Sequence, residues 1–503
     1  SGQGFVFNVG ERVLGTTTPL YALLLALFAK LGLPAAALGK AINILADGAL
    51  CVVVYRWLSL LDQSTAGYWA AFFIAVNPIQ IRVAISGQES SLAALCGALV
   101  WLWYTERRCF AAYLAGATLF LLRWDGLILI GVLTIAILVR ERRVPVRELI
   151  LFVGVCAPWL LFAVWYFGSP IPVTLAAKAT VYGWYFPAQR FPQMPSLLYR
   201  LGGTPRYALM ACAALVGIAR LGWERRPSPL RSSLLPPIAW FILYWLAFLV
   251  SKVLLFEWYL VPPLFVYEML VALGLTTLGA AIANRLAGIA PAARSKQMQY
   301  GAACLFVCCL GVTNIRDAYK YTQSLQQLED HLRRPLGLWL QAHSQTGDRV
   351  MLEPIGYIGY YSRLPVIDMT GLVTPGVLTS YSRTNRCPWF SIAEKYRPEW
   401  CVLRPWEAEA MKRAPAIAGH TWQEDYGYVC AFTYDAQTGD GPTVFEIYHR
   451  KPWNEFQGYK SAVVRLRGHR KRRGRYIFLS AQADNRTIED PDFNPGTLMQ
   501  EVA

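Results

Sequence analysis

The sequence has few charged residues, few histidines and no Cys-x-x-Cys pair. Only 16% of its 503 residues are charged and 55% are hydrophobic, above the ~45–50% apolar share of soluble proteins. The five His begin only at His331, and no two Cys have the Cys-x-x-Cys spacing of many zinc and redox sites. These features indicate a chain embedded in a bilayer, and they exclude a histidine-based metal site in its membrane region.

An initiator Met, a basic leader and an apolar signal segment are also missing. We therefore expect a fragment or a processed product. Most of the 11 Cys lie within or beside apolar segments, where they act as small apolar fillers. Cys387, Cys401 and Cys430 lie in the polar C-terminal part, where one disulfide can form and one thiol would remain.

Apolar segments able to cross a bilayer alternate with short basic loops. These loops hold many of the Lys and Arg residues behind the net charge of +16, so the positive-inside bias explains that charge better than nucleic-acid binding. The loops expected in the cytoplasm contain Arg56, Arg107–Arg108, Arg140–Arg147, Arg220–Arg231 and Arg285–Lys296. The ten expected spans are Lys40–Leu61, Gly67–Gln80, Ser90–Tyr104, Phe110–Leu122, Gly126–Val139, Leu149–Phe167, Tyr207–Leu221, Pro236–Val250, Tyr259–Ala281 and Gln299–Val312.

The other loops are expected on the extracytoplasmic face, together with the C-terminal domain. They are Arg82–Glu89, Arg123–Asp125, Gly168–Arg206 and Ser251–Trp258. If the apolar stretch Thr17–Leu33 crossed the membrane, the residues before it would no longer lie on the extracytoplasmic face. We therefore expect an interfacial or re-entrant helix there.

After Val312 the pattern changes to that of a small α/β domain. Short β-like runs at Arg349–Leu352, Leu364–Asp368 and Trp400–Leu403 alternate with helical stretches at Asp317–Gln341 and Ile392–Tyr396. We therefore predict a polytopic α-helical membrane domain over residues 1–314 and an extracytoplasmic α/β domain over 315–453. The tail 454–503 has seven basic residues between Arg465 and Arg475, and we expect it to be disordered or to bind anionic lipid or polymer.

The N-terminal motif is a polar, Gly-rich loop that opens into an apolar helix. A phosphate could bind at the N-terminus of this helix, beside the hydroxyls of Thr16–Thr18 and the charge of Arg12. A purely structural interpretation is a Thr N-cap with Pro19 at the first helical position. Both interpretations stay open.

Several motifs, taken in order, resemble the arabinofuranosyltransferase-like GT-C glycosyltransferases. The run Gly-x-Gly-Phe-Val-Phe-Asn-x-Gly-Glu-Arg-Val-x-Gly-Thr-x-x-Pro-Leu resembles the segment that follows the family's paired-Asp motif. Further similar segments are Ser86–Ser90, Arg123–Gly126, Gly168–Lys178 and Ile358–Val373. Gln88, Trp124, Asp125 and Val173 depart from the family's Met, Pro, Glu and Asn.

The resemblance implies a GT-C-like fold and a polyprenyl-phosphate-dependent, inverting glycosyltransferase in the plasma or inner membrane. The sugar would pass on the extracytoplasmic face to a glycan, lipid or protein acceptor of the cell envelope, as in cell-wall biogenesis. The family's first span and paired Asp, its principal base, would lie upstream of Ser1. No cofactor or metal ligand is assigned, and a requirement for a divalent cation stays open.

The candidate catalytic residues are Glu89 and Asp125, because glycosyl transfer needs a base that activates the acceptor hydroxyl. Each could instead pair with Arg82 or Arg123 and serve topology alone. The candidate donor-binding residues are Glu11, Arg12, Thr16, Arg123 and Lys178. Lys178 could also be a snorkelling interface residue, and Trp258 and Tyr259 fit an aromatic belt better than a sugar platform.

Two alternatives from other classes are a membrane transporter and a non-catalytic glycan-binding membrane protein. The transporter is disfavoured because no two halves of the chain repeat one another and because the charges cluster at one surface instead of at mid-membrane. The binding protein requires that no catalytic residues precede Ser1.

Overall fold

The computed structural model describes residues 4–185, 205–223, 228–251, 255–286, 311–382, 384–434 and 443–451, and the backbone of three later strands. The chain divides into two compact units. The helical unit comprises Thr16–Pro172 and Phe186–Tyr321; the sheet unit comprises Ser1–Gly15, Val173–Tyr185 and Thr322–Ala503. Two segments from the first 314 residues therefore belong to the sheet unit.

Hydrogen bonds explain why these two segments belong to the sheet unit. The Asn8 side chain donates to the Val366 carbonyl oxygen and accepts from the Val366 N–H, both at 2.9 Å. Farther along, the Val173 N–H donates to the Leu14 carbonyl oxygen at 3.0 Å. The N-terminal loop thus pairs with a strand, which hydropathy along the sequence does not reveal.

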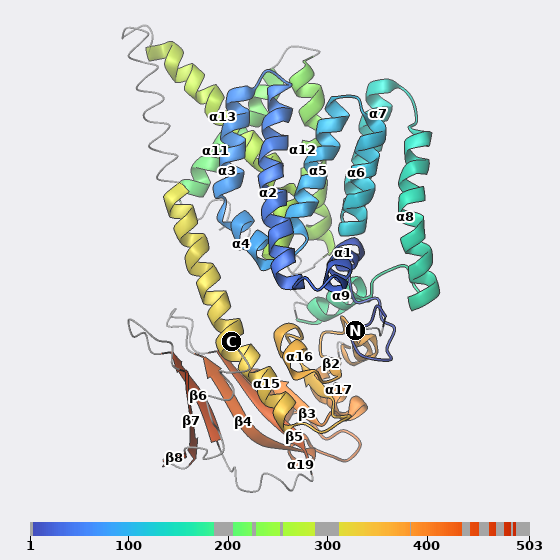
Figure 1. Ribbon diagram of the computed structural model, residues 1–503, viewed down its shortest axis with the longest axis vertical. Helices are drawn as coiled ribbons and strands as arrows, with labels where there is room; N and C mark the ends of the chain where they lie inside the picture. Colours follow the sequence, from blue (N-terminus) through green and yellow to red (C-terminus); the bar gives the residue numbers. More distant parts are fainter. Residues whose placement is uncertain are drawn as a thin grey trace. The chain divides into compact units, whose positions relative to one another are not determined.

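The helical unit is an assembly of apolar helices, several of which run side by side (Figure 1). Among the described residues, four helices, α2, α8, α12 and α13, are long and apolar enough to cross a membrane, and the bent pair α3–α4 would make a fifth. This unit is therefore a helical membrane domain of a multi-pass protein. The helices are α1 (Pro19–Lys30), α2 (Ala35–Ser59), α3 (Ser64–Val76), α4 (Pro78–Ser86), α5 (Ser90–Thr105), α6 (Cys109–Leu122), α7 (Gly126–Glu141), α8 (Val146–Phe167), α11 (Pro205–Trp223), α12 (Pro229–Ser251), the 3-10 turn η1 (Glu257–Tyr259) and α13 (Val261–Leu286).

The predicted span Gly67–Gln80 is not one helix. It consists of α3 and α4, which meet at a bend of 54°. Asn77 has extended backbone angles before Pro78, as expected for a residue that precedes proline. Its side-chain oxygen accepts from the N–H groups of Ile79 and Gln80, at 2.9 and 3.3 Å, and so caps α4. The Asn-Pro pair is a local signal for this break.

Close packing of α11 against α13 depends on glycine. A Cβ on Gly274 would collide with the Ala213 carbonyl oxygen, and one on Gly217 would collide with the Leu270 carbonyl oxygen. Small residues at such crossings let two helix backbones approach each other in a membrane, where van der Waals packing holds helices together.

The sheet unit contains an eight-stranded mixed sheet of order β2-β1-β3-β5-β4-β6-β7-β8. The predicted β runs are confirmed as β1 (Val350–Leu352), β2 (Val366–Asp368) and β3 (Trp400–Leu403), which pair in parallel. The other strands are β4 (Tyr426–Tyr434), β5 (Thr443–Arg450), β6 (Ala462–Gly468), β7 (Ile477–Ala483) and β8 (Arg486–Ile488).

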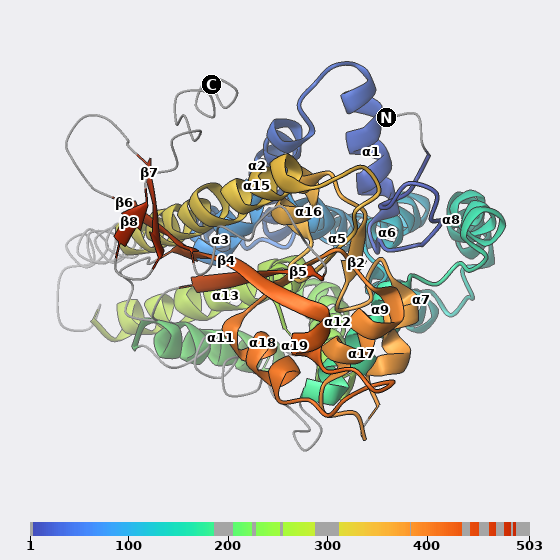
Figure 2. The same ribbon diagram turned by 90° about the horizontal axis from the view of Figure 1, so that it is seen from below.

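Helices of the sheet unit precede and cover these strands. The predicted helix at Asp317–Gln341 corresponds to helical residues 311–328, the π-helical turn η2 (Glu329–Arg333) and α15 (Arg334–His343). Figure 2 shows α17, α18 and α19 beside one another. The elements are α9 (Val173–Tyr185), α16 (Gly356–Ser362), the 3-10 helix η3 (Pro375–Ser380), α17 (Pro388–Tyr396), α18 (Pro405–Lys412) and α19 (Trp422–Asp425).

Three predictions for the C-terminal part differ from the structure or lie outside it. The tail expected to be disordered contains β6–β8, because β6 pairs with β4 and covers its otherwise open edge. The thiols of Cys387, Cys401 and Cys430 are free and buried, so no disulfide forms among them. Most of the predicted span Gln299–Val312 lies outside the described residues.

Candidate functional site

Three of the predicted site residues meet at one end of the helical unit. Glu89 and Asp125 are the N-cap residues of α5 and α7, and Arg123 is the C-cap residue of α6. Carboxylates at helix N-termini and a cation at a helix C-terminus are each favoured by the helix dipole. The helix dipoles therefore favour each of these charges at its own helix end, in addition to the contacts between the side chains.

Arg123 links the two carboxylates. Its Nη1 donates to Glu89 Oε1 at 3.0 Å, and its Nη2 donates to Asp125 Oδ2 at 2.6 Å. Its Nε also lies 3.2 and 3.1 Å from the two Asp125 oxygens. The Arg123 side chain is 5% exposed, against 13% for Glu89 and 15% for Asp125. The guanidinium is thus buried, and the two carboxylates that contact it are mostly buried.

Side chains and backbone from distant parts of the chain complete this cluster. The Tyr244 hydroxyl, on α12, lies 3.2 Å from Asp125 Oδ2 and 2.8 Å from the Tyr259 carbonyl oxygen. Ser90 donates to the Trp258 carbonyl oxygen at 3.0 Å. The Arg123 guanidinium lies 5.2 Å from the Tyr259 ring centroid, close enough for a cation–π contact.

The charges of this cluster do not cancel. Burial alone lowers the pKa of the Arg123 guanidinium, but Asp125, Tyr244 and Glu89 raise it well above its ordinary value. Arg123 therefore stays a cation, and by formal charge the two carboxyl side chains of Glu89 and Asp125 outnumber it. This arrangement suits a base better than it suits a pocket for the donor phosphate.

Glu89 and Asp125 differ in how many hydrogen bonds they accept. Both Asp125 oxygens are bonded, to Arg123 and Tyr244. Glu89 accepts from Arg123 through Oε1, while no hydrogen bond reaches its Oε2 from the part of the chain that the structure describes. Glu89 thus has one oxygen held by Arg123 and one that accepts no hydrogen bond from the described residues.

The loop before Glu89 is fixed by a polar contact between three helices. The Tyr21 hydroxyl lies 2.7 Å from the Gly87 carbonyl oxygen and 3.2 Å from that of Gly39. Asn43 donates to the Tyr21 hydroxyl at 2.8 Å. Gly87 has φ +76°, a backbone conformation that glycine adopts without strain. The predicted helix at Thr17–Leu33, now α1, therefore positions the Ser86–Glu89 loop.

Thr16 lies before α1, in the helical unit. Its hydroxyl accepts from the Thr18 N–H at 3.1 Å. Pro19 is the first residue of the helix, as predicted, whereas Thr18 occupies the N-cap position without a side-chain capping bond.

The other three predicted donor-binding residues fall in the sheet unit. Glu11 accepts a hydrogen bond from Asn8 at 2.9 Å. Arg12 belongs to the N-terminal segment and Lys178 to α9. The structure therefore brings Glu89, Arg123 and Asp125 together and assigns Glu11, Arg12 and Lys178 to a different compact unit.

Sequence reasoning missed two carboxylates within the spans. Asp47, on α2, accepts from Gln80 Nε2 at 2.5 Å, and Glu268, on α13, accepts from Asn77 Nδ2 at 2.7 Å. The statement that charges cluster at one surface was therefore wrong. Both lie in predicted spans, Lys40–Leu61 and Tyr259–Ala281, so an acidic residue within an apolar run was the available signal.

Asp368 and Gly371 shape a turn in the sheet unit. The Asp368 carboxylate accepts from the Thr370 N–H at 2.9 Å and from its hydroxyl at 2.7 Å. Burial raises the pKa of the Asp368 carboxyl, while these hydrogen bonds lower it. Gly371 has φ +78°. The motif that resembles the family's C-terminal domain is thus a structural turn here.

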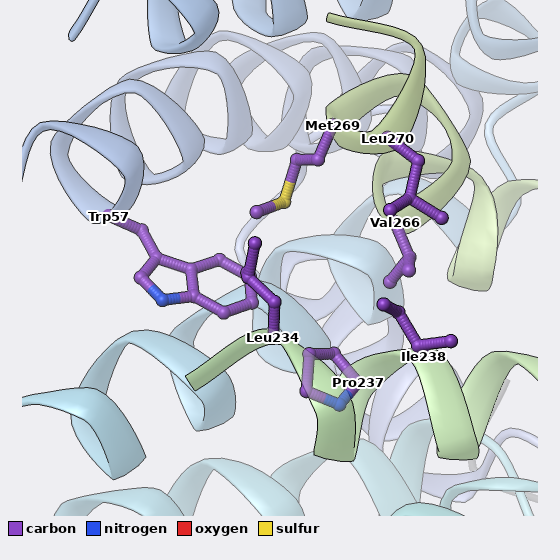
Figure 3. Close-up of a pocket in the computed structure, with 7 residues that line it drawn as sticks. All are labelled: Trp57, Leu234, Pro237, Ile238, Val266, Met269 and Leu270. Atoms are coloured by element: carbon purple, nitrogen blue, oxygen red, sulfur yellow. The ribbon is translucent and has the colours of Figure 1, made fainter. Parts of the chain in front are cut away.

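The described cavities do not coincide with the charged cluster. Figure 3 shows a space of about 10 Å³ lined by Trp57, Met269 and other apolar residues of α2, α12 and α13, about the size of one water. A polar depression of about 430 Å³ is lined by Asp62, Gln63 and Arg220, among others. Among the described residues, no group of three or more His, Cys, Asp or Glu could hold a metal ion.

Membrane helices are followed by a C-terminal sheet region, and similarity to a solved structure shows the GT-C-like fold that the sequence resemblance predicted. The chain is similar to the crystal structure of ArnT from Cupriavidus metallidurans bound to undecaprenyl phosphate, with a TM-score of 0.50 and 13% identity over 88% of this chain and 90% of that chain.

Two further solved structures are less similar. One is ArnT from the same organism in the apo state, with a TM-score of 0.45 and 13% identity over 82% of this chain and 83% of that chain. The other is the arabinofuranosyltransferase AftD from Mycobacteria, with a TM-score of 0.40 and 15% identity over 89% of this chain and 36% of that chain. A family model described as a domain of unknown function (DUF8728) matches residues 314–448. No curated protein matches the sequence.

Proposed function

We propose that this chain is a membrane glycosyltransferase that moves a sugar from a polyprenyl-phosphate donor to an acceptor hydroxyl. The observation that carries the proposal is Glu89, held by a buried arginine through one oxygen while the other accepts no hydrogen bond from the described residues. The GT-C-like fold, which this chain shares with a protein solved with undecaprenyl phosphate, supports a lipid-phosphate donor.

In this reaction the acceptor oxygen attacks the anomeric carbon of the donor sugar. The bond between that carbon and the phosphate oxygen breaks, and polyprenyl phosphate leaves with the electron pair. Glu89 Oε2 takes the acceptor's proton, and Arg123 holds the carboxylate in place. A single displacement of this kind inverts the anomeric centre.

The finer assignments of the family resemblance belong to the same proposal. They are an extracytoplasmic reaction at the plasma or inner membrane, a cell-envelope glycan, lipid or protein as acceptor, and specificity like that of the arabinofuranosyltransferases.

The test is transfer of radiolabelled sugar from polyprenyl-phosphate donors by the purified full-length protein, with Glu89→Gln and Glu106→Gln compared. Glu106 follows α5 at its other end and pairs with Arg56 at 2.8 Å, so it is a matched control. We expect Glu89→Gln to lower kcat by about 10²–10⁴-fold, the usual contribution of general-base catalysis, and Glu106→Gln to retain activity. Equal rates for both variants and the unsubstituted protein would remove Glu89 from the mechanism.

A transporter is the second candidate, because Asp47 and Glu268 lie within spans and such carboxylates mark ion or proton pathways in pumps and transporters. Reconstituted vesicles distinguish the two. If no polyprenyl-phosphate sugar is consumed while solute flux depends on Asp47 or Glu268, the glycosyltransferase proposal fails.

A further inference from the structure

Three polar side chains hold the short helix α4, which leads into the Ser86–Glu89 loop. They belong to the N-cap residue Asn77 and to Gln80 and Arg82 of the helix itself. Asn77 bonds to Glu268 on α13, Gln80 to Asp47 on α2, and Arg82 to Glu257 of η1 at 2.8 Å. The nine-residue helix also packs apolar side chains, Val83 and Ile79, against the core of the helical unit. The three polar bonds add directional contacts to three neighbouring elements.

The contact between Asn77 and Glu268 requires an acceptor on α13. The Asn77 oxygen is already used, because it caps the N–H groups of Ile79 and Gln80. Only its NH₂ group remains to bond outside α4. Glu268 is 0% exposed, so an apolar side chain in its place would leave a buried donor without a partner, which costs ~1–3 kcal/mol.

The contact between Gln80 and Asp47 follows the same logic. Gln80 is 2% exposed, and its NH₂ group donates to the Asp47 carboxylate. Neither Asp47 nor Glu268 forms an ion pair with any of the described residues. The hydrogen bonds from Gln80 and Asn77 come from amide NH₂ groups, which require acceptor oxygens and do not require a negative charge.

The end of α4 determines where Glu89 lies. After Ser86 the chain turns through Gly87 and reaches Glu89 two residues later. A shift of α4 would therefore move the Glu89 carboxylate relative to Arg123 and a bound acceptor. A displacement of 1 Å can cost about 10²-fold in rate.

We propose that Asp47 and Glu268 are positioning residues that fix α4 and thereby the Glu89 carboxylate. They act as hydrogen-bond acceptors within the spans and exchange no proton during turnover. This inference rests on the proposed function for its effect on rate, and on geometry alone for its effect on the loop.

The first test compares Glu268→Leu and Asp47→Leu with Glu268→Gln and Asp47→Asn. We expect the Leu variants to lower kcat by about 10–10²-fold with little change in the donor KM. The amide variants should stay near the unsubstituted rate and keep its pH profile, because an amide oxygen still accepts. Tyr113→Phe is the matched control, since it removes a 2.7 Å contact to Thr134 that does not involve α4.

A second experiment exchanges the donor and acceptor groups of Asn77 and Glu268, and it tests the proposal even if the Leu variants do not fold. Asn77→Asp places a carboxylate against Glu268, and adding Glu268→Gln restores a donor and an acceptor with their positions exchanged. We expect Asn77→Asp alone to lose activity and the double variant to regain it. Inactive but folded amide variants, or a double variant no better than Asn77→Asp, would overturn the proposal.

Hydrogen exchange provides a readout that does not depend on turnover. We expect the Leu variants to speed amide exchange over residues 77–89 while α7 keeps its protection. If the protein transfers no sugar but this local change occurs, the proposed function fails and the positioning role stands. Leu variants that exchange like the unsubstituted protein would contradict the positioning role even in an active enzyme.

Discussion

At the scale of single residues, the main finding is that one buried guanidinium organises two carboxylates. The sequence predicted Glu89, Arg123 and Asp125 as site residues and named pairing with Arg82 or Arg123 as the competing structural role. The structure selects Arg123 for both carboxylates and gives Arg82 a different partner, Glu257. The pairing explains how a carboxylate can be both anchored and open at a helix N-terminus.

Tyr244 is the residue whose loss should reveal how much Asp125 contributes to the cluster. Tyr244→Phe removes the hydroxyl that bonds to Asp125 and Tyr259 while keeping the ring, which is 1% exposed. We expect a kcat about tenfold lower, equivalent to ~1.4 kcal/mol of transition-state energy. Tyr113→Phe, at 0% exposure, should leave kcat unchanged; equal kcat values for the two variants would exclude a role for Tyr244 in the cluster.

His449 gives the sheet unit a measurable pH dependence. Burial lowers the pKa of its imidazole, so the folded state binds fewer protons than the unfolded state below the ordinary pKa of about 6.5. Its neutral form is fully stabilising above that pH, and stability falls as the pH falls toward the folded-state pKa. Between pH 7.5 and 5.5 the Tm of the unsubstituted protein should therefore drop more than that of His449→Asn; parallel Tm curves would refute this.

At the scale of elements, helix boundaries were predictable where a long apolar run sets the helix. They were not predictable where the contacts of a single side chain set the boundary. Hydropathy located α2, α5, α6 and α7, because each is apolar along most of its length. It merged α3 with α4, although Asn77-Pro78 carried a local break signal, because the contact that holds Asn77 against Glu268 joins residues far apart in sequence. The short β runs were correct because β-branched and apolar residues dominate β1–β3.

The crossing of α11 and α13 should be sensitive to the smallest added side chain. Gly274→Val places a branched side chain against the Ala213 carbonyl oxygen, and overpacking of this kind costs about 1–3 kcal/mol. Gly279, on the same helix, has open space where its Cβ would be, so Gly279→Val is the matched control. Thermal unfolding in detergent should show a lower Tm for Gly274→Val only; a similar loss in both variants would point to helix propensity instead.

At the scale of the whole molecule, the sequence predicted the class of fold but not which segments belong to which unit. The N-terminal loop and α9 precede or interrupt the apolar helices, so hydropathy assigned them to the membrane domain. Their hydrogen bonds with Val366 and with each other are contacts across hundreds of residues. The partners Tyr244 and Tyr259 of the charged cluster were unpredictable for the same reason.

The orientation of the protein in the membrane is a prediction of the basic loops that can be checked directly. Single cysteines would be introduced as Arg107→Cys and Ser169→Cys in a Cys212→Ala background. The two positions lie on loops that are expected on opposite faces of the membrane. A membrane-impermeant maleimide added to intact cells should label Ser169→Cys at once and Arg107→Cys only after permeabilisation. The reverse pattern would place the Glu89 cluster on the cytoplasmic face.

The shared arginine of the charged cluster also has an evolutionary consequence. Removing Asp125 alone leaves Arg123 short of an acceptor, and removing Arg123 alone leaves two buried carboxylates to repel each other across helix ends. Single replacements at these three positions should therefore be selected against more strongly than coordinated ones. Across natural relatives, we expect positions 89, 123 and 125 to vary together, as a covarying set, or not at all.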